Sequence, residues 1–555
     1  MMRSYTATPV SPGLVIGPCR LILRREAALH AVLQTPAAEQ SLFDAARILA
    51  QGELTALMER ADNDDAREIM MFQHAILDDS AFLNKVTDGI EQEKGAIGAV
   101  QEALRHFSSI MRQLDDAYFS ARSADIEDVG LRLCAILAGE SYDPITLTEP
   151  AILAAENLYP SDLVGVDRHN LLGIVIAEGS PQSHAAIIAR TLGIPALILA
   201  GTEFLQYADG TEMALDAAHG EFFLEPDSAT RARFHHQQLL ARRRTLYLES
   251  LRTTPCATKD GTRIKLLANC SNPEDIRLAL AAGAEGVGLL RSEFLFIDDH
   301  LPDEAEQIAY YRSCIAAAGG TPLTIRTMDV GADKRIAGLS AENEDNPALG
   351  LRGVRLTLAY ENLLITQFRA LLQAAVDGPL RIMVPMIATP DDLHRTRLIY
   401  DRVRAALAAE GKCFDDTVPL GVMIETPAAA ILSDLLAKEA AFFSIGTNDL
   451  TQYTLAADRT NPAVDEYYRP DSEAVLRMVH LTLYNANAAG VGCSICGESA
   501  AVPALASRYV QLGARSLSMA APSIPEVKDA LLELDLRALP FTPPLPPAVE
   551  ALQNG

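Results

Sequence analysis

The residue of this chain best placed by its local sequence to do chemistry is His184. It follows an apolar segment, residues 171–177, that is typical of a buried strand. Ser183 can cap a short helix that Gly193 would end, so we expect His184 in the first helical turn. Free backbone N–H groups and the positive end of the helix dipole favour an anion there. This position suits a histidine that carries a phosphoryl group, although a histidine that only caps or packs is the alternative.

A second set of reactive side chains lies far away, in the C-terminal half of the chain. Its members each stand at or just beyond the end of an apolar run, and they are Arg291, Arg326, Asp329, Asp333, Lys334, Glu425, Asn448, Asp449, Arg459 and Cys496. Arginine forks fit the oxygens of phosphate and carboxylate groups, and Asn448 offers a donor for a carboxylate. Two carboxylates such as Glu425 and Asp449 commonly hold Mg²⁺. Singly, an arginine or carboxylate of this set is more often part of a surface or inter-helix ion pair, but together the residues predict a site for a small, doubly anionic, metal-bound substrate.

The elements that must position this second set alternate between strand and helix. The expected strands are residues 265–270, 286–290, 323–328, 382–386, 421–424, 442–445, 492–495 and 516–519. Eight such strand–helix units predict a closed (β/α)₈ TIM barrel, residues 255–540. Reactive groups of that fold gather beyond the carboxyl ends of the strands, so we expect the second set at one mouth of the barrel.

The N-terminal half has a different pattern. Short strands in residues 1–23 and 141–226 predict one α/β domain that contains His184. Helical periodicity between them, residues 24–140, predicts an inserted all-helical domain. A helical linker, 227–254, and a C-terminal tail, 541–555, complete the expected organisation. Within the insert we expect helices at 39–60, 66–77, 80–93, 96–117 and 125–137.

Composition limits the classes of partner. The chain has 555 residues, 22% of them charged, and a net charge of −26, which disfavours nucleic acid and anionic membranes as partners. No apolar run reaches the ~18–20 residues of a membrane span, and the N-terminus lacks a signal-peptide core. We therefore expect a cytoplasmic protein, which agrees with eight scattered cysteines.

One cysteine pair, Cys493 and Cys496, has the spacing of a zinc or redox motif. No second pair of ligands with suitable spacing follows it, and it stands at a strand end instead of opening a helix. We therefore favour separate roles for the two thiols.

Several longer motifs resemble the phosphoenolpyruvate-utilising enzymes and, more narrowly, the enzyme I family of the bacterial phosphoenolpyruvate:sugar phosphotransferase system. The similar segments are residues 183–190 (SHAAIIAR), 286–296 (GVGLLRSEFLF), 326–329 (RTMD), 423–427 (MIETP) and 443–453 (FSIGTNDLTQY), with 73–77 (QHAIL) and 125–130 (DIEDVG) in the helical insert. Because they extend over nearly the whole chain and agree with one another, the resemblance is specific.

The resemblance implies a role for each candidate residue. His184 would take the phosphoryl group of phosphoenolpyruvate and pass it to a histidine of a small carrier, HPr or an HPr-like protein. Cys496 would protonate the enolate carbon to release pyruvate. The remaining roles are Mg²⁺ binding by Glu425 and Asp449, phosphate binding by Arg291, Arg326 and Arg352, carboxylate binding by Asn448 and Arg459, and a substrate contact by Lys334. The resemblance further implies a swivelling phosphohistidine domain, a carrier-binding helical insert and a homodimer formed through the barrel.

The chain departs from the family pattern near the histidine. Ser180, Pro181 and Gln182 replace a glycine, an arginine and a threonine, and Leu163 stands where the family tends to place a threonine that could bind the histidine ring. Gly331–Ala332 also replaces a Gly–Gly pair. These changes leave open a regulatory paralogue that senses phosphoenolpyruvate and is phosphorylated without driving sugar uptake. A dikinase or synthase relative is disfavoured because residues 24–140 hold no glycine-rich phosphate loop.

Overall fold

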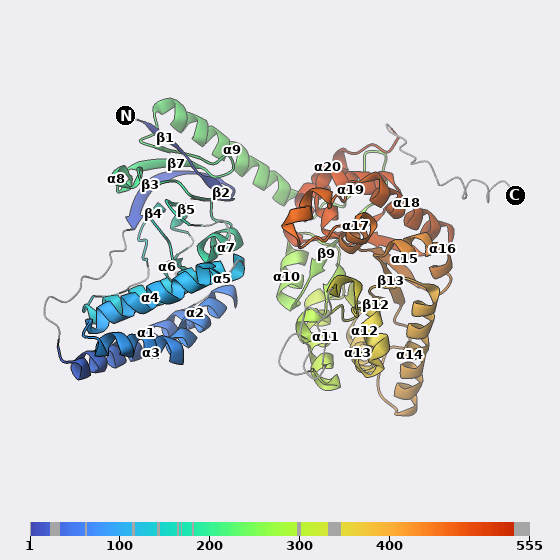
Figure 1. Cartoon of the computed structure of the whole chain (residues 1–555). Helices are drawn as coiled ribbons and strands as arrows, with labels where there is room; N and C mark the ends of the chain where they lie inside the picture. Colours follow the sequence, from blue (N-terminus) through green and yellow to red (C-terminus); the bar gives the residue numbers. More distant parts are fainter. Residues whose placement is uncertain are drawn as a thin grey trace. The chain divides into compact units, whose positions relative to one another are not determined.

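The structure is a computed structural model that divides into two compact units, residues 1–243 and 244–555 (Figure 1). The described residues are 2–22, 34–60, 64–113, 117–140, 142, 145–163, 166–167, 169–179, 183–296, 301–330 and 346–537. Among them, no helix combines the length and the apolar character needed to cross a membrane.

The second unit is built around a closed barrel of eight parallel strands (Figure 1). The strands are β9 (Lys265–Cys270), β10 (Val287–Arg291), β11 (Leu323–Arg326), β12 (Leu380–Val384), β13 (Leu420–Ile424), β14 (Phe442–Ile445), β15 (Gly492–Ile495) and β16 (Ser516–Met519). The barrel closes through the parallel pairing of β16 with β9. The expected TIM barrel is therefore confirmed, and each strand lies within two residues of its expected bounds.

Helices surround the barrel, and several of them begin at a residue whose side chain caps the helix. They are α10 (Pro273–Ala281), α11 (Glu304–Ala318), α12 (Val354–Ala359), α13 (Glu361–Ala374), α14 (Pro390–Ala409), α15 (Pro427–Ile431), α16 (Ser433–Leu436), α17 (Thr447–Leu455), α18 (Glu473–Ala488), α19 (Pro503–Gln511) and α20 (Ile524–Glu533). Asp303 and Thr389 form capping boxes at the starts of α11 and α14. Apolar side chains between the strands and these helices form the main core, which fixes the strand ends in place.

The first unit contains an eight-stranded sheet with the order β1-β8-β7-β3-β4-β5-β6-β2. The strands are β1 (Arg3–Thr6), β2 (Thr8–Ser11), β3 (Leu14–Ile22), β4 (Ala151–Ala155), β5 (Leu171–Ile176), β6 (Ala196–Ile198), β7 (Glu212–Asp216) and β8 (Glu221–Leu224). Short helices α6 (Pro160–Leu163), α7 (His184–Thr191) and α8 (Leu205–Ala208) connect some of them. β3 runs without a break through Gly17 and Pro18, which both pair with β7.

The insert of the first unit is all-helical, as the sequence predicts. Its helices are α1 (Pro36–Arg60), α2 (Asp64–Ile76), α3 (Ser80–Glu91), α4 (Gly95–Gln113) and α5 (Ala117–Leu137). The expected start of the last helix at residue 125 is wrong: α5 begins at Ala117, since residues 117–124 contain no helix breaker. One apolar core includes side chains of these helices and of α7, so the insert packs against the α7 side of the sheet.

A long polar helix, α9 (Ser228–Ser250), connects the two units. Its first part belongs to the sheet, where Phe234 is buried. Its last part belongs to the barrel, where Arg244 pairs with Asp529 at 2.6 Å and Lys528 donates to the Leu251 carbonyl oxygen at 3.0 Å.

Candidate functional site

The barrel brings most of the second set of reactive residues to one end. Arg291 and Arg326 are the last residues of β10 and β11, and they are register partners in the sheet. Glu425 directly follows β13, Asp449 lies in the first turn of α17 after β14, and Cys496 directly follows β15. Because all eight strands are parallel, these positions share the carboxyl end of the barrel.

Arg326 is held by two carboxylates. Its Nη2 lies 2.5 Å from Glu293 Oε1, and its Nη1 lies 2.9 Å from Asp329 Oδ2. The Arg326 side chain is only 11% exposed, and its buried Nε has no hydrogen-bond partner. A guanidinium has five N–H donors, so the pairing fixes the plane of Arg326 and leaves donors for an anionic ligand.

Arg352 connects Asp329 to Asp449. Its Nη2 and Nε lie 2.9 Å and 3.3 Å from the two oxygens of Asp329, and its Nη1 lies 3.2 Å from Asp449 Oδ1. The same Nη1 donates to the Tyr453 hydroxyl at 3.2 Å. Burial alone would raise the pKa of Asp329, but the neighbouring Arg326 and Arg352 outweigh it and hold that pKa below its ordinary value.

Glu425 is buried, with 1% exposure, and its Oε1 accepts the Met386 N–H at 2.6 Å. Met386 has a φ of +58°, which is strained for a non-glycine residue and directs this N–H at the carboxylate. Burial, followed by the charges of Asp449 and Asp329, raises the pKa of Glu425 to about 8. Two buried carboxylates that repel each other in this way are a suitable donor set for a divalent cation.

No group of three or more His, Cys, Asp or Glu residues that could hold a metal occurs in the described part of the chain. Glu425 and Asp449 therefore form a pair of carboxylates without a third His, Cys, Asp or Glu ligand among the described residues. Mg²⁺ fits such a site better than Zn²⁺ does, because it retains waters and takes further ligands from a substrate.

Cys496 is a buried thiol, 3% exposed, at the end of β15. Its Sγ donates to the Ile445 carbonyl oxygen at 3.6 Å, and Asn269 donates to the Cys496 carbonyl oxygen at 2.9 Å. Burial raises the pKa of the Cys496 thiol to about 11, against the opposing effect of a hydrogen bond with Ser444. The thiol is therefore protonated at neutral pH and can act as an acid.

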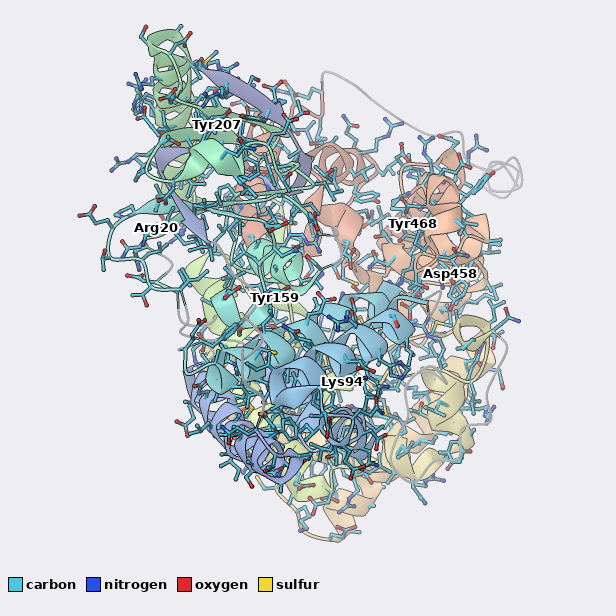
Figure 2. All side chains as sticks on the ribbon, turned by 60° about the vertical axis from the view of Figure 1, so that its left-hand side comes forward. Arg20, Lys94, Tyr159, Tyr207, Asp458 and Tyr468 are labelled. Atoms are coloured by element: carbon cyan, nitrogen blue, oxygen red, sulfur yellow. The ribbon has the colours of Figure 1, made fainter. Side chains whose placement is uncertain are left out.

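The rim of the site contains the more accessible candidates. Asn448 Oδ1 accepts the Glu498 N–H at 2.9 Å, and the Tyr468 hydroxyl, labelled in Figure 2, donates to the Asn448 carbonyl oxygen at 3.2 Å. Arg291 is half-buried and Arg459 is exposed, so their guanidinium groups are available to a ligand. Lys334 lies outside the described residues, as do Asp333, the Gly331–Ala332 pair and residues 180–182.

His184 is the first residue of α7, in the first unit. Ser183 caps this helix as expected, because its Oγ accepts the Ala186 N–H at 3.3 Å. The helix ends at Thr191, and Gly193 follows with a φ of +65°. Leu163, in the position of the family's threonine, is the buried last residue of α6. The structure thus confirms the helical position expected for His184.

The sequence interpretation missed two residues of the site. Glu293 was not considered, although it stands two positions after Arg291 in the RSEF segment, a spacing that could have suggested it. Tyr453 lies one turn after Asp449 on α17 and so faces the same side of the helix. Each accepts a hydrogen bond from an arginine of another part of the barrel: Glu293 from Arg326, and Tyr453 from Arg352.

Three family models match the chain. Their descriptions are PEP-utilising enzyme, N-terminal (residues 6–122), mobile domain (residues 147–220) and PEP-binding domain (residues 247–536). The chain is 36% identical over 503 residues to a phosphoenolpyruvate-protein phosphotransferase of Bacillus sp. (strain S), covering 90% of this chain and 87% of that protein. It is 34% identical over 545 residues to the protein of the same name from Streptococcus equinus, covering 96% and 94%. It is 38% identical over 550 residues to a multiphosphoryl transfer protein of Xanthomonas campestris pv. campestris, covering 95% of this chain and 63% of that protein.

Proposed function

The chain belongs to the family of PEP-utilising enzymes, and from this membership we propose that it is a phosphoenolpyruvate-dependent protein phosphotransferase. His184 takes the phosphoryl group from phosphoenolpyruvate at the barrel mouth and passes it to a histidine of HPr or an HPr-like carrier. The observation that carries this proposal is that the PEP-binding-domain match, residues 247–536, contains the arginine–carboxylate cluster at one end of the barrel.

The substrate is held by the charges already described. Arg326, fixed by Glu293 and Asp329, directs its remaining N–H donors at the phosphate, with Arg291 beside it at the next strand end. Asn448 and Arg459 bind the carboxylate end of the substrate. Such fixed donors favour a transition state in which negative charge spreads over the phosphoryl oxygens.

The reaction exchanges one bond to phosphorus for another. The bond from phosphorus to the enol oxygen breaks, and a bond from phosphorus to a ring nitrogen of His184 forms. The enolate left behind takes a proton on carbon from the Cys496 thiol and becomes pyruvate. The thiolate then regains its proton from water, since the pKa of Cys496 is raised to about 11.

A metal ion completes the site in this proposal. Glu425 and Asp449 would hold Mg²⁺, which when bound would neutralise charge on the phosphate and enol oxygens. Arg352, with Asp329, orients Asp449 for this role. Lys334 and Arg352 remain proposed substrate contacts.

The histidine and the barrel belong to different units, so the transfer requires the units to approach and separate. We propose that residues 1–23 and 141–226 form the swivelling phosphohistidine domain, that residues 24–140 dock the carrier, and that residues 227–254 link these to the barrel, 255–540. The expected tail, 541–555, lies outside the described residues. A homodimer through the barrel and a cytoplasmic location complete the proposal.

The test uses phosphoenolpyruvate labelled on phosphorus, Mg²⁺ and purified HPr. Unmodified protein should gain acid-labile label and lose it to HPr, with pyruvate formed. His184→Ala should abolish labelling and transfer while phosphoenolpyruvate still binds, and His169→Ala, a change at an exposed histidine of the same unit, should alter neither. Labelling without transfer to any carrier would support the regulatory alternative, and an unlabelled chain would refute both.

A further inference from the structure

A buried carboxylate far from the barrel has no role in the proposed reaction. Asp128, on α5, is fully buried and accepts four hydrogen bonds. Its Oδ1 accepts from the Tyr142 hydroxyl at 2.9 Å and from Ser161 Oγ at 2.8 Å. Its Oδ2 accepts from Gln73 Nε2 at 2.8 Å and from the Ser161 N–H at 3.2 Å. We call these four residues the Asp128 cluster.

The donors of the Asp128 cluster come from three separate parts of the first unit. Gln73 lies on α2 of the helical insert, Tyr142 lies where the chain leaves the insert, and Ser161 lies on α6. All of them are buried, the most exposed being Tyr142 at 5%. The Asp128 cluster therefore joins the insert to α6 by polar bonds of defined direction, which apolar contacts alone do not provide.

The short helix α6 is the element between the insert and the histidine. It contacts α2 and α5 on one side and α7, which begins at His184, on the other. Figure 2 shows Tyr159, just before α6, between Arg20 of the sheet strand β3 and Lys94 of the insert. Leu163, which ends α6, stands where the family tends to place a threonine that could bind the histidine ring. Because α6 contacts α7, the position of α6 affects the position of the first turn of α7.

We propose that the Asp128 cluster positions the start of α7 relative to the carrier-docking insert. By fixing Ser161, it holds α6 at one place against α2 and α5, and α6 in turn supports the helix that begins at His184. A carrier docked on the insert then meets the phosphohistidine at a set distance. This inference rests on the proposed function, and it explains two family-like motifs, residues 73–77 and 125–130, that the reaction itself does not use.

The test removes one bond across this junction and compares it with a matched bond elsewhere. Ser161→Ala deletes the 2.8 Å bond to Asp128 but keeps the backbone N–H bond, so the fold is retained. Ser108→Ala is the control, because Ser108 is also buried and bonds the adjacent α5 residue, Glu127, at 2.6 Å, entirely within the insert. Thermal unfolding of both variants measures any general loss of stability.

The two half-reactions are then measured separately on the full chain. We expect Ser161→Ala to slow transfer of label to HPr by about tenfold, because a small misplacement of the reacting groups is costly. Its labelling by phosphoenolpyruvate should not be reduced, and Ser108→Ala should change neither rate by more than about twofold. A purely structural role would slow both half-reactions together.

Equal slowing of both half-reactions by Ser161→Ala, or transfer as fast as in Ser108→Ala, would overturn the inference and leave the proposed function intact. If the unmodified chain takes no label from phosphoenolpyruvate, the proposed function fails, and the inference fails with it.

Discussion

The substitution Glu425→Gln tests the charge arrangement of the barrel mouth most directly. Glutamine keeps an oxygen for the Met386 N–H but cannot ionise. The pKa of Glu425 is raised from 4.5 to about 8, so folding favours its protonated form. Without metal, the wild-type barrel should therefore lose stability relative to the variant as the pH rises from about 4.5 through about 8.

The size of this effect follows from the same values. The rise in the pKa of Glu425 from 4.5 to about 8 lowers the free energy of unfolding of the wild type by at most ~5 kcal/mol, and this limit is reached above pH 8. At pH 5 the free energies of unfolding of the wild type and of Glu425→Gln should differ from this cause by only about 1 kcal/mol, because Glu425 is still protonated in the folded protein. At about 2 °C for each kcal/mol, the variant's barrel should unfold about 5–10 °C higher than the wild-type barrel at pH 9.

Scanning calorimetry of the full chain with a chelator, at pH 5 and pH 9, measures this difference. Mg²⁺ at millimolar concentration should then raise the wild-type barrel transition at pH 9 and leave that of Glu425→Gln unchanged. Glu304→Gln on α11 is the control of opposite sign. Against the effect of burial, hydrogen bonds from Arg369 and Gln373 lower the pKa of Glu304, so this substitution should destabilise the barrel at pH 9.

A lower unfolding temperature for metal-free Glu425→Gln than for the wild type at pH 9 would refute this prediction. The prediction is also refuted if Mg²⁺ raises both transitions equally, since the ion would then bind without this carboxylate.

Two further substitutions examine the proton donor and its support. Cys496→Ala should still bind phosphoenolpyruvate but slow steady-state pyruvate formation by about 10²-fold or more, measured with a coupled pyruvate assay, and an unchanged rate would exclude the thiol as the acid. Gly497→Ala places a Cβ 1.7 Å from Thr447 Oγ1, so it should destabilise the barrel by about 1–3 kcal/mol and displace Cys496, lowering both the unfolding temperature and the rate. Gly492→Ala, at the first residue of β15, meets no atom within 4 Å and should change neither, and equal effects of the two glycine substitutions would contradict the packing argument.

The barrel, and most of the residues that lie at its carboxyl end, could be predicted from the sequence for a physical reason. Apolar runs bounded by caps and turns mark buried parallel strands, and the residue after each run must lie at the carboxyl end. The positions of Arg326, Glu425 and Asp449 at this end of the barrel follow from this pattern. The start of α5 was misplaced because residues 117–124 have acceptable helix propensity without a clear apolar stripe, so periodicity gave no signal there.

The partners within each site could not be predicted, because they depend on how distant elements meet. Nothing in the sequence relates Glu293 to Arg326, or Gln73 to Asp128 and Ser161, until helices and strands are packed. These are buried side-chain hydrogen bonds, whose formation depends on distances of a few tenths of an ångström. Periodicity sets which face a residue occupies, but it does not set that distance.

The ion pairs at the mouth of the barrel leave an excess of negative charge. Four largely buried carboxylates, Glu293, Asp329, Glu425 and Asp449, contact or lie close to two guanidinium groups, Arg326 and Arg352. With every carboxylate ionised, this cluster carries two excess negative charges, in a chain whose net charge is already −26. Such a cluster repels an anionic substrate, and the raised pKa of Glu425 is one sign of that repulsion. A dication held by Glu425 and Asp449, as proposed, would balance the two excess charges, and the remaining donors of Arg326 and the rim arginines could then attract an anionic substrate. If the proposed metal site is correct, the acidic character of the mouth would make phosphoenolpyruvate binding depend on metal binding.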